Sequence, residues 1–233
     1  MDIENLIIEV TRKCNMSCGH CLRGCSQNID INNQYITDVL EKIESVSTVT
    51  FTGGEPVLNP SAIVHFLNEC KRLNIEVGDF YIATNGKIVT DEFMKTLLDL
   101  YLFCNWKESC LIEISNDYYH DVEGQDSDVK EQLMAFRFAE IKGRREHESM
   151  LYEGSYKDVG SDNGNYVKAC EYDLEDDGIR GSEVYLNALG NLINGCDWSY
   201  ESQEREDLIV CKSSEFSLEK FVEFSKKMEL CEV

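Results

Sequence analysis

The chain has 233 residues, of which 44 are acidic and 22 basic, giving a formal net charge of −22 at pH 7. This length suits one domain, and an apolar content of 42% excludes a disordered chain. No stretch approaches the roughly 20 apolar residues that span a bilayer, so we expect no membrane partner. The acidic excess repels phosphate backbones and argues against nucleic acid as a partner. It suits a basic peptide or a small molecule, although solubility alone also explains it.

Strands and helices alternate through the first two thirds of the sequence. Short apolar runs predict strands, and apolar residues spaced three or four apart predict helices. Asn59 before Pro60, and Thr90 before Asp91, are expected to cap helices. In chain order we expect strand 6–10, helix 33–46, strand 48–52, helix 60–73, strand 77–84, helix 91–104, strand 111–115, loop 116–126, helix 129–139 and strand 149–152.

The last third is less regular. Residues 154–182 are rich in Gly, Asp, Asn and Glu and show no clear periodicity, which indicates a surface loop or a cover over the substrate. Residues 183–189 and 191–194 predict a hairpin around Gly190, and 217–228 an amphipathic helix. Repeated strand–helix units require right-handed crossovers and a parallel sheet. Five or six such units are too few for a closed eight-stranded barrel, so the fold class is α/β with a partial, open parallel barrel.

Three cysteines follow the first strand closely: Cys14, Cys18 and Cys21. Structural zinc takes four protein ligands and a four-iron cubane has four corners, so three thiolates leave one metal position open for another ligand. Two alternatives use a fourth ligand. Cys25 would complete a fully ligated electron-carrying cluster, and either His20 or Cys25 would complete a zinc site.

The spacing Cys-x3-Cys-x2-Cys, followed by Phe-Thr-Gly-Gly-Glu-Pro at 51–56, resembles the signature of the radical S-adenosylmethionine (radical SAM) superfamily. The resemblance implies a (β/α)6 core and a [4Fe-4S] cluster on Cys14, Cys18 and Cys21. It also implies S-adenosylmethionine on the fourth iron, and sensitivity to oxygen. We expect residues 1–153 to form this core. Residues 154–233 would complete the same domain as a short irregular extension with an acidic loop, a last strand or hairpin and a final helix.

The resemblance also assigns residues to S-adenosylmethionine. Gly53, Gly54 and Glu55 would lie at its methionine amino group, and His20 holds the place of a residue that lies against adenine. Polar groups after the third and fourth strands would contact its ribose or carboxylate, namely Thr84, Asn85, Ser115 and Asp117. Turn formation at Asn85 and helix or loop capping by Ser115 and Asp117 are the structural alternatives. The catalytic residue that meets the substrate cannot be assigned.

The carboxy-terminal cysteines allow a second cluster. The segment 190–197, with Cys170 before it, resembles a degenerate SPASM or twitch extension, and Cys211 and Cys231 would add ligands. The alternative is a strand and hairpin carrying buried free thiols. Eleven cysteines without a charged and apolar leader indicate a reducing cytoplasm.

By resemblance we expect an oxidoreductase-type radical SAM enzyme that abstracts hydrogen from a peptide or protein and draws electrons from a flavodoxin or ferredoxin type donor. A small metabolite or nucleoside precursor is the alternative substrate. A non-catalytic iron–sulfur protein that transfers electrons or senses redox state is the competing class.

Overall fold

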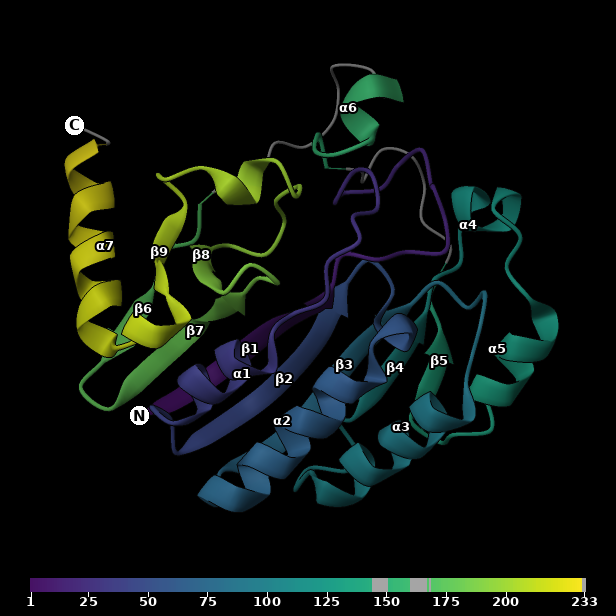
Figure 1. The fold of residues 1–233 in the computed structure, drawn as a ribbon, viewed down its shortest axis with the longest axis horizontal. Coiled ribbons are helices and arrows are strands. Elements are labelled where there is room, and N and C mark those ends of the chain that lie inside the picture. Colours follow the sequence, from purple (N-terminus) through teal and green to yellow (C-terminus); the bar gives the residue numbers. More distant parts are fainter. Residues whose placement is uncertain (144–150, 160–166, 168, 232–233) are drawn as a thin grey trace.

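A computed structural model describes residues 1–143, 151–159, 167 and 169–231. The elements of the first half alternate as predicted (Figure 1). They are β1 (Asp2–Thr11), α1 (Asn33–Leu40), β2 (Ser45–Gly53), the 3-10 helix η1 (Pro56–Leu58), α2 (Pro60–Leu73), β3 (Glu76–Thr84), α3 (Asp91–Phe103), β4 (Leu111–Ile114), α4 (Tyr118–Val122), α5 (Ser127–Leu133) and β5 (Ala139–Ile141).

The second half adds shorter elements. They are α6 (Tyr156–Val159), β6 (Asp173–Glu175), β7 (Gly178–Leu186), β8 (Asn191–Asn194), η3 (Ser202–Glu204), β9 (Ile209–Lys212), η4 (Ser213–Glu215) and α7 (Leu218–Cys231). The predicted hairpin around Gly190 is confirmed, because β7 and β8 pair antiparallel and Gly190 has a φ of 83°. The surface loop or cover predicted across 154–182 was wrong for its last part, since β6 and the start of β7 form a second hairpin.

One open sheet carries the fold, in the order β5-β4-β3-β2-β1-β7-β8-β9, with β6 on β7. Neighbouring strands from β5 to β7 run parallel, which confirms an α/β fold with an open, mostly parallel sheet. The last parallel strand, β7, lies beside β1. The sheet therefore grows outward from β1 on both sides, and β1 is a central strand.

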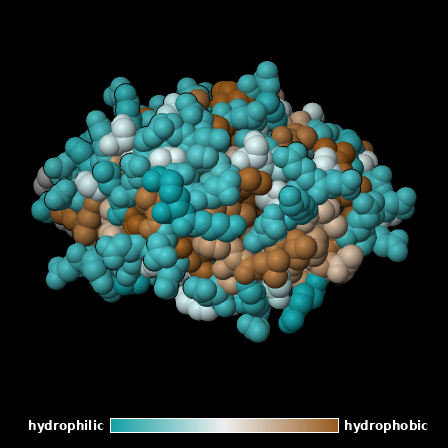
Figure 2. All heavy atoms as spheres, turned by 60° about the horizontal axis from the view of Figure 1, so that its bottom comes forward, coloured by the Kyte–Doolittle hydropathy of each residue, from teal (hydrophilic) through white to brown (hydrophobic). Residues whose placement is uncertain are grey.

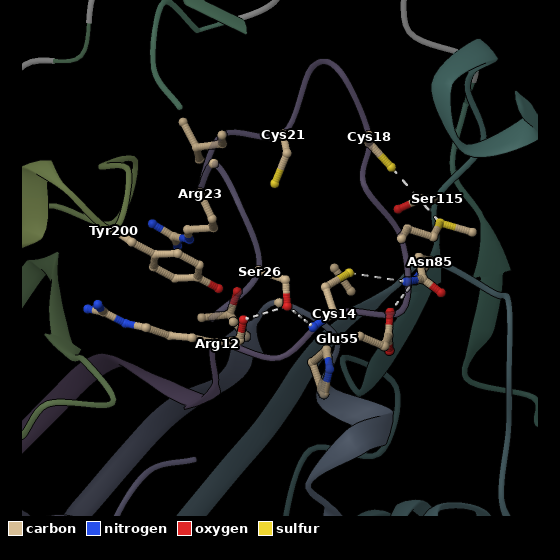
Figure 3. Close-up of a pocket in the computed structure, with 18 of the residues that line it drawn as sticks. Arg12, Cys14, Cys18, Cys21, Arg23, Ser26, Glu55, Asn85, Ser115 and Tyr200 are labelled. Atoms are coloured by element: carbon tan, nitrogen blue, oxygen red, sulfur yellow. Dashed lines mark hydrogen bonds between the residues drawn. The ribbon is translucent and has the colours of Figure 1, made fainter. Parts of the chain in front are cut away.

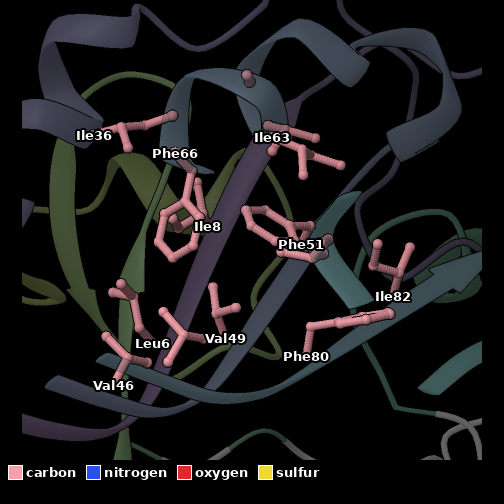
Figure 4. Packing of buried hydrophobic residues seen from close by; sticks show 14 of the residues in the cluster. Leu6, Ile8, Ile36, Val46, Val49, Phe51, Ile63, Phe66, Phe80 and Ile82 are labelled. Carbon is pink, nitrogen blue, oxygen red and sulfur yellow. The ribbon is translucent and has the colours of Figure 1, made fainter. Parts of the chain in front are cut away.

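The two faces of the central strands differ in chemistry. Val49 and Phe51 of β2 turn toward α1 and α2, where Phe51 meets Phe66 edge to face at 5.2 Å (Figure 4). Thr50 and Thr52 alternate with them and line a cavity on the other face. Parallel strands covered by helices on both faces are usually apolar on both. The polar alternation of β2 therefore marks a face that is open to a ligand.

Helices α1, α2 and α3 lie side by side on the face opposite the cavity (Figure 1). Figure 2 shows that their outer surface is mainly hydrophilic, with hydrophobic groups between the polar ones. Leu98 and Leu102 of α3 are 44% and 64% exposed. None of the helices in the described ranges is both long and apolar enough to cross a membrane.

Several predicted boundaries were wrong. The helix from residue 33 ends at Leu40, because β2 already begins at Ser45. The helix from 129 ends at Leu133, and the fifth strand is the short β5. Of the predicted strand 149–152, residues 149–150 lie outside the described residues, and Leu151 and Tyr152 belong to no named strand. The predicted loop 116–126 contains α4.

The two predicted helix caps had different outcomes. Thr90 caps α3 as predicted, since its hydroxyl accepts from the Phe93 N–H. Asn59 makes no side-chain cap to α2. Its Nδ2 donates instead to the Val10 carbonyl oxygen at 2.7 Å. Asn59 therefore ties the start of α2 to β1 near the loop that carries the cysteine triplet.

Candidate functional site

The cluster loop, residues 12–31, leaves β1 at Thr11 and returns to it. Thr11 bridges Asp30, and the Ile31 N–H donates to the Val10 carbonyl at 3.1 Å. This closed loop lies at the carboxyl ends of the parallel strands (Figure 1). Such ends are where ligands bind in open α/β sheets. The position of the triplet at the end of the first strand thus places it at the binding edge.

All three predicted cluster ligands line one cavity of about 840 Å³. Cys14, Cys18 and Cys21 are half-buried, and Figure 3 shows their side chains around its centre. The Cys14 N–H donates to the Ser26 hydroxyl at 2.9 Å, and the Cys21 N–H to the Cys18 carbonyl at 3.0 Å. Three soft sulfur donors facing one cavity are a suitable set for iron.

Two of the triplet thiols, those of Cys14 and Cys18, have raised pKa values. Burial, together with the negative charges of Cys21 and Cys14, raises the pKa of Cys18 to about 12. Burial also raises the pKa of Cys14. Crowded thiolates that repel one another are relieved by a bound cation, because metal binding displaces the thiol protons. The donor set therefore fits a cationic metal centre.

Gly53 and Gly54 hold the cluster loop against β2. A Cβ on Gly53 would stand 2.0 Å from the Thr11 carbonyl oxygen, and one on Gly54 2.1 Å from that of Lys13. The Gly54 and Glu55 N–H groups donate to these same two oxygens at 2.8 Å. The close approach that requires glycine here is therefore to the end of β1 and to the start of the cluster loop. Both glycines also line the cavity.

Glu55 joins the ends of β2 and β3. Its carboxylate is 1% exposed and accepts from the Thr84 hydroxyl at 2.8 Å and from the Asn85 N–H at 2.7 Å. Burial raises the pKa of Glu55 to about 7. Both Glu55 and Thr84 line the cavity while their polar atoms hold each other. We call Gly53, Gly54, Glu55, Thr84 and Asn85 the motif wall.

Asn85 reaches the triplet directly. Its Nδ2 donates to Asn15 Oδ1 at 2.8 Å and lies 3.7 Å from Cys14 Sγ. Ser115 lines the same cavity beyond it, and its N–H donates to the Thr84 carbonyl at 2.9 Å. Figure 3 places Asn85 and Ser115 on the same side of the cavity.

His20 and Asp117 meet beside the cluster loop. The His20 ring, which lines the cavity, stacks on Tyr119 with centroids 4.3 Å apart. Asp117 caps α4 by accepting from the His120 N–H at 3.0 Å, and its other oxygen lies 2.7 Å from His120 Nδ1. His20 Nε2 is 3.5 Å from this carboxylate. The capping role that the sequence left open for Asp117 is present.

A second wall faces the first across the cavity, and the sequence did not predict it. Its arginines come from the cluster loop, and its other members come from the carboxy-terminal third. We call it the arginine wall, with members Arg12, Arg23, Glu183, Cys196, Asp197 and Tyr200 (Figure 3 labels three of them).

Arg12 is fully buried. It pairs with Glu9 at 2.7 Å, donates to Gln203 Oε1 at 2.8 Å and lies 4.6 Å from the centre of the Tyr200 ring. Arg23 donates to the Trp198 carbonyl at 2.6 Å. No short sequence pattern predicts the contacts to Gln203, Tyr200 and Trp198, because these partners lie far along the chain.

The remaining cysteines have different surroundings. Cys25 is exposed and also borders the cavity. Cys196 lines the cavity, and the Cys170 backbone is bound by the Asn194 side chain. Cys211 is instead packed in the hydrophobic core, while the side chain of Cys231 lies outside the described residues. The structure does not bring Cys211 to the cavity that Cys196 lines.

The profile of the radical SAM superfamily matches residues 8–146, which is more than half of the chain. The chain belongs to the radical SAM superfamily. The match contains the triplet, the Gly-Gly-Glu motif and the polar ends of β3 and β4. Radical SAM enzymes as a family use a [4Fe-4S] cluster and S-adenosylmethionine.

Curated relatives share only part of this radical SAM chain. It is 31% identical over 101 residues to the tungsten-containing aldehyde ferredoxin oxidoreductase cofactor-modifying protein of Pyrococcus furiosus, covering 41% of this chain and 27% of that one. It is 32% identical over 91 residues to the GTP 3′,8-cyclase of Clostridium acetobutylicum, covering 36% and 28%. The chain thus spans less than a third of the length of these two relatives.

Solved structures share the radical SAM fold over nearly the whole chain. Native anSMEcpe with bound AdoMet and Cp18Cys peptide superimposes with a TM-score of 0.60 at 10% identity, covering 97% of this chain and 82% of that one. BtrN in an open conformation superimposes with a TM-score of 0.50 at 13% identity, covering 96% and 84%. Both likenesses establish the fold.

Proposed function

We propose that Cys14, Cys18 and Cys21 hold a [4Fe-4S] cluster at which the enzyme cleaves S-adenosylmethionine reductively. The observation that carries this proposal is the convergence of three half-buried thiols on one cavity. When bound, the cluster supplies the electron that splits the sulfonium into methionine and a 5′-deoxyadenosyl radical, which takes a hydrogen atom from the substrate. The electron donor would be of flavodoxin or ferredoxin type.

The chain's own residues would bind and orient S-adenosylmethionine. Gly53 and Gly54 line the cavity on the motif wall, and Asn85 offers an amide next to Cys14. Glu55 and Thr84 keep this wall in place through their mutual hydrogen bond. His20 would lie against the adenine, and Ser115 and Asp117 would serve the ribose or carboxylate.

The strand faces of the cavity would receive the substrate. Thr50 and Thr52 of β2 and Tyr81 of β3 line it and give it hydroxyl groups. We propose a peptide or protein substrate, because anSMEcpe, which shares the fold, has been solved with a peptide bound. We further propose that residues 154–233 complete a single domain with residues 1–153, since β7 pairs with β1 along most of its length.

Anaerobic reconstitution with iron and sulfide tests the cluster assignment. We expect about four irons in the wild-type chain and in Cys25→Ala, and loss of the cluster in each alanine variant of the triplet. Addition of S-adenosylmethionine and a strong reductant should release 5′-deoxyadenosine. Two results together would instead identify a non-catalytic iron–sulfur protein. The cluster would be lost in Cys25→Ala, and its spectrum would not change when S-adenosylmethionine is added. About eight irons would indicate a second cluster involving Cys170 and Cys196.

A small metabolite or nucleoside precursor is the second candidate substrate. It is favoured by the likeness to a GTP 3′,8-cyclase, a protein named for a nucleotide substrate. Release of 5′-deoxyadenosine can be measured in the presence of peptide pools and of nucleotide pools. Stimulation by peptides alone supports the first candidate, and stimulation by nucleotides alone replaces it with the second.

A further inference from the structure

Tyr200 presents a buried hydroxyl without a partner. The residue is 2% exposed, and its hydroxyl has no hydrogen-bond partner among the residues that the structure describes. A buried polar group normally finds a partner, so each exception needs an explanation. Tyr185 provides a contrast nearby, because its hydroxyl donates to Glu9 Oε2 at 2.7 Å.

The phenol is held firmly in its position. The Tyr200 N–H donates to the Arg23 carbonyl at 3.1 Å, which ties the residue to the cluster loop. The Arg12 guanidinium lies over the ring at 4.6 Å, and Arg12 is itself fixed by Glu9 and Gln203. The position of the Tyr200 ring is therefore set by two contacts with the cluster loop, one to the Arg23 backbone and one to the Arg12 side chain.

That direction is into the cavity. Tyr200 lines the cavity, and Figure 3 shows its hydroxyl pointing inward from the side opposite Asn85. Cys21 lines the same cavity as Tyr200, and both are labelled in Figure 3. Burial raises the pKa of Tyr200, so the phenol keeps its proton at neutral pH and can donate.

We propose that the Tyr200 hydroxyl donates a hydrogen bond to the sulfur atoms on the Cys21 side of the cluster and thereby raises its reduction potential. The inference rests on the proposed function, because it requires the cluster. Each electron added to an iron–sulfur cluster increases the negative charge on its sulfurs. A donor aimed at them stabilises the reduced form more than the oxidised form. Tyr200 is thus a positioning and tuning residue rather than a catalytic one.

The test is an EPR-monitored redox titration of the reconstituted enzyme without S-adenosylmethionine. Tyr200→Phe keeps the ring over Arg12 and removes only the hydroxyl. We expect it to bind about four irons, as the wild type does, and to show a more negative midpoint potential. Tyr172→Phe is the matched control. Its phenol contacts the Ile193 carbonyl at 3.5 Å and packs on Phe221 outside the cavity, so its potential should equal that of the wild type.

A second substitution works in the opposite direction. Tyr200→3-fluorotyrosine keeps the shape and has a more acidic, stronger donor, so its potential should become more positive. If Tyr200→Phe fails to take up iron, the potential of the fluorotyrosine variant alone tests whether the hydroxyl raises the reduction potential of the cluster. Unchanged potentials in the variants that load would overturn the inference. A shift that appears only with S-adenosylmethionine would overturn it too, by assigning the hydroxyl to that ligand. A wild-type chain without a cluster would count against the proposed function instead.

Discussion

The two walls of the cavity are built in opposite ways. The motif wall consists of short runs at the ends of adjacent strands, and backbone groups hold it to the cluster loop at 2.8 Å. The arginine wall depends on side chains that meet across the chain, as when Gln203 binds both Glu9 and Arg12. In the sequence, Gln203 is separated from Arg12 by 191 positions and from Glu9 by 194 positions.

Because they are built differently, the two walls contribute differently to the site. On the motif wall, Glu55 and Thr84 bind each other, so the wall mainly fixes the shape of the site. The arginine wall leaves one donor, the Tyr200 hydroxyl, without a described protein partner. We therefore expect damage to the motif wall to prevent cluster binding, and damage to the arginine wall to alter stability and cluster properties.

The largest effect on cluster binding is expected for Gly54→Ala. Its Cβ would stand 2.1 Å from the Lys13 carbonyl oxygen, which is backbone and cannot move aside without moving the cluster loop. Loss of most iron uptake should accompany a fall of about 2 kcal/mol or more in the free energy of unfolding. Iron analysis after reconstitution and urea denaturation measure the two effects. Gly143→Ala is the control, because its Cβ would meet nothing within 4 Å; equal iron uptake by both variants would contradict the role given to Gly54.

The sequence predicted the motif wall because its determinants are local. Three cysteines after one strand and Gly-Gly-Glu after the next are close in sequence and, in a parallel sheet, close in space. The contact between Arg12 and Tyr200 could not be found this way, since nothing near either residue in the sequence indicates the other. The sequence also contains a signal for the β2 side of the cavity. Thr48, Thr50 and Thr52 give β2 a polar face that a fully covered parallel strand would lack.

The long elements of the fold were predictable for the same reason, but the short ones were not. Long strands such as β1 and β3 have clear apolar runs, whereas β5 has only three residues, Ala-Glu-Ile, with little strand signal. Phe136 and Phe138 continue the apolar spacing of α5 and so extended the predicted helix too far. In the structure they stack at 4.8 Å before β5 and pack at the core.

Arg12→Met should destabilise the chain by about 3–5 kcal/mol, because it leaves the Glu9 carboxylate buried without its cation. Chemical denaturation of the cluster-free chain measures this loss. Arg205→Met is the control: Arg205 pairs with Asp207 at an exposed position, where ion pairs contribute little. If the two variants lose the same stability, the arginine wall is not anchored through Arg12.

Glu55→Gln should change how stability depends on pH. The pKa of Glu55 is raised from 4.5 to about 7 in the folded chain, so its stabilising effect is fully present below pH 4.5 and is lost as pH rises through 7. The difference corresponds to about 3 kcal/mol. Unfolding of the cluster-free chain between pH 5 and 8 should show a weaker pH dependence in Glu55→Gln. Glu44→Gln, at an 87% exposed side chain, should keep the wild-type dependence.

Replacement of Asp117 has the smallest expected effect on stability. It tests whether this residue only caps α4 or also binds S-adenosylmethionine. As the cap of α4, it should cost about 1 kcal/mol when replaced by alanine and much less when replaced by asparagine, whose side-chain oxygen still accepts from the His120 N–H. Thermal unfolding of both variants measures this. Affinity for S-adenosylmethionine then separates binding from capping: we expect Asp117→Asn, which keeps the cap but loses the charge, to bind more weakly than the wild type. Unchanged affinity would leave Asp117 as a helix cap that orients His120 beside His20, and would remove it from the residues that contact the cofactor.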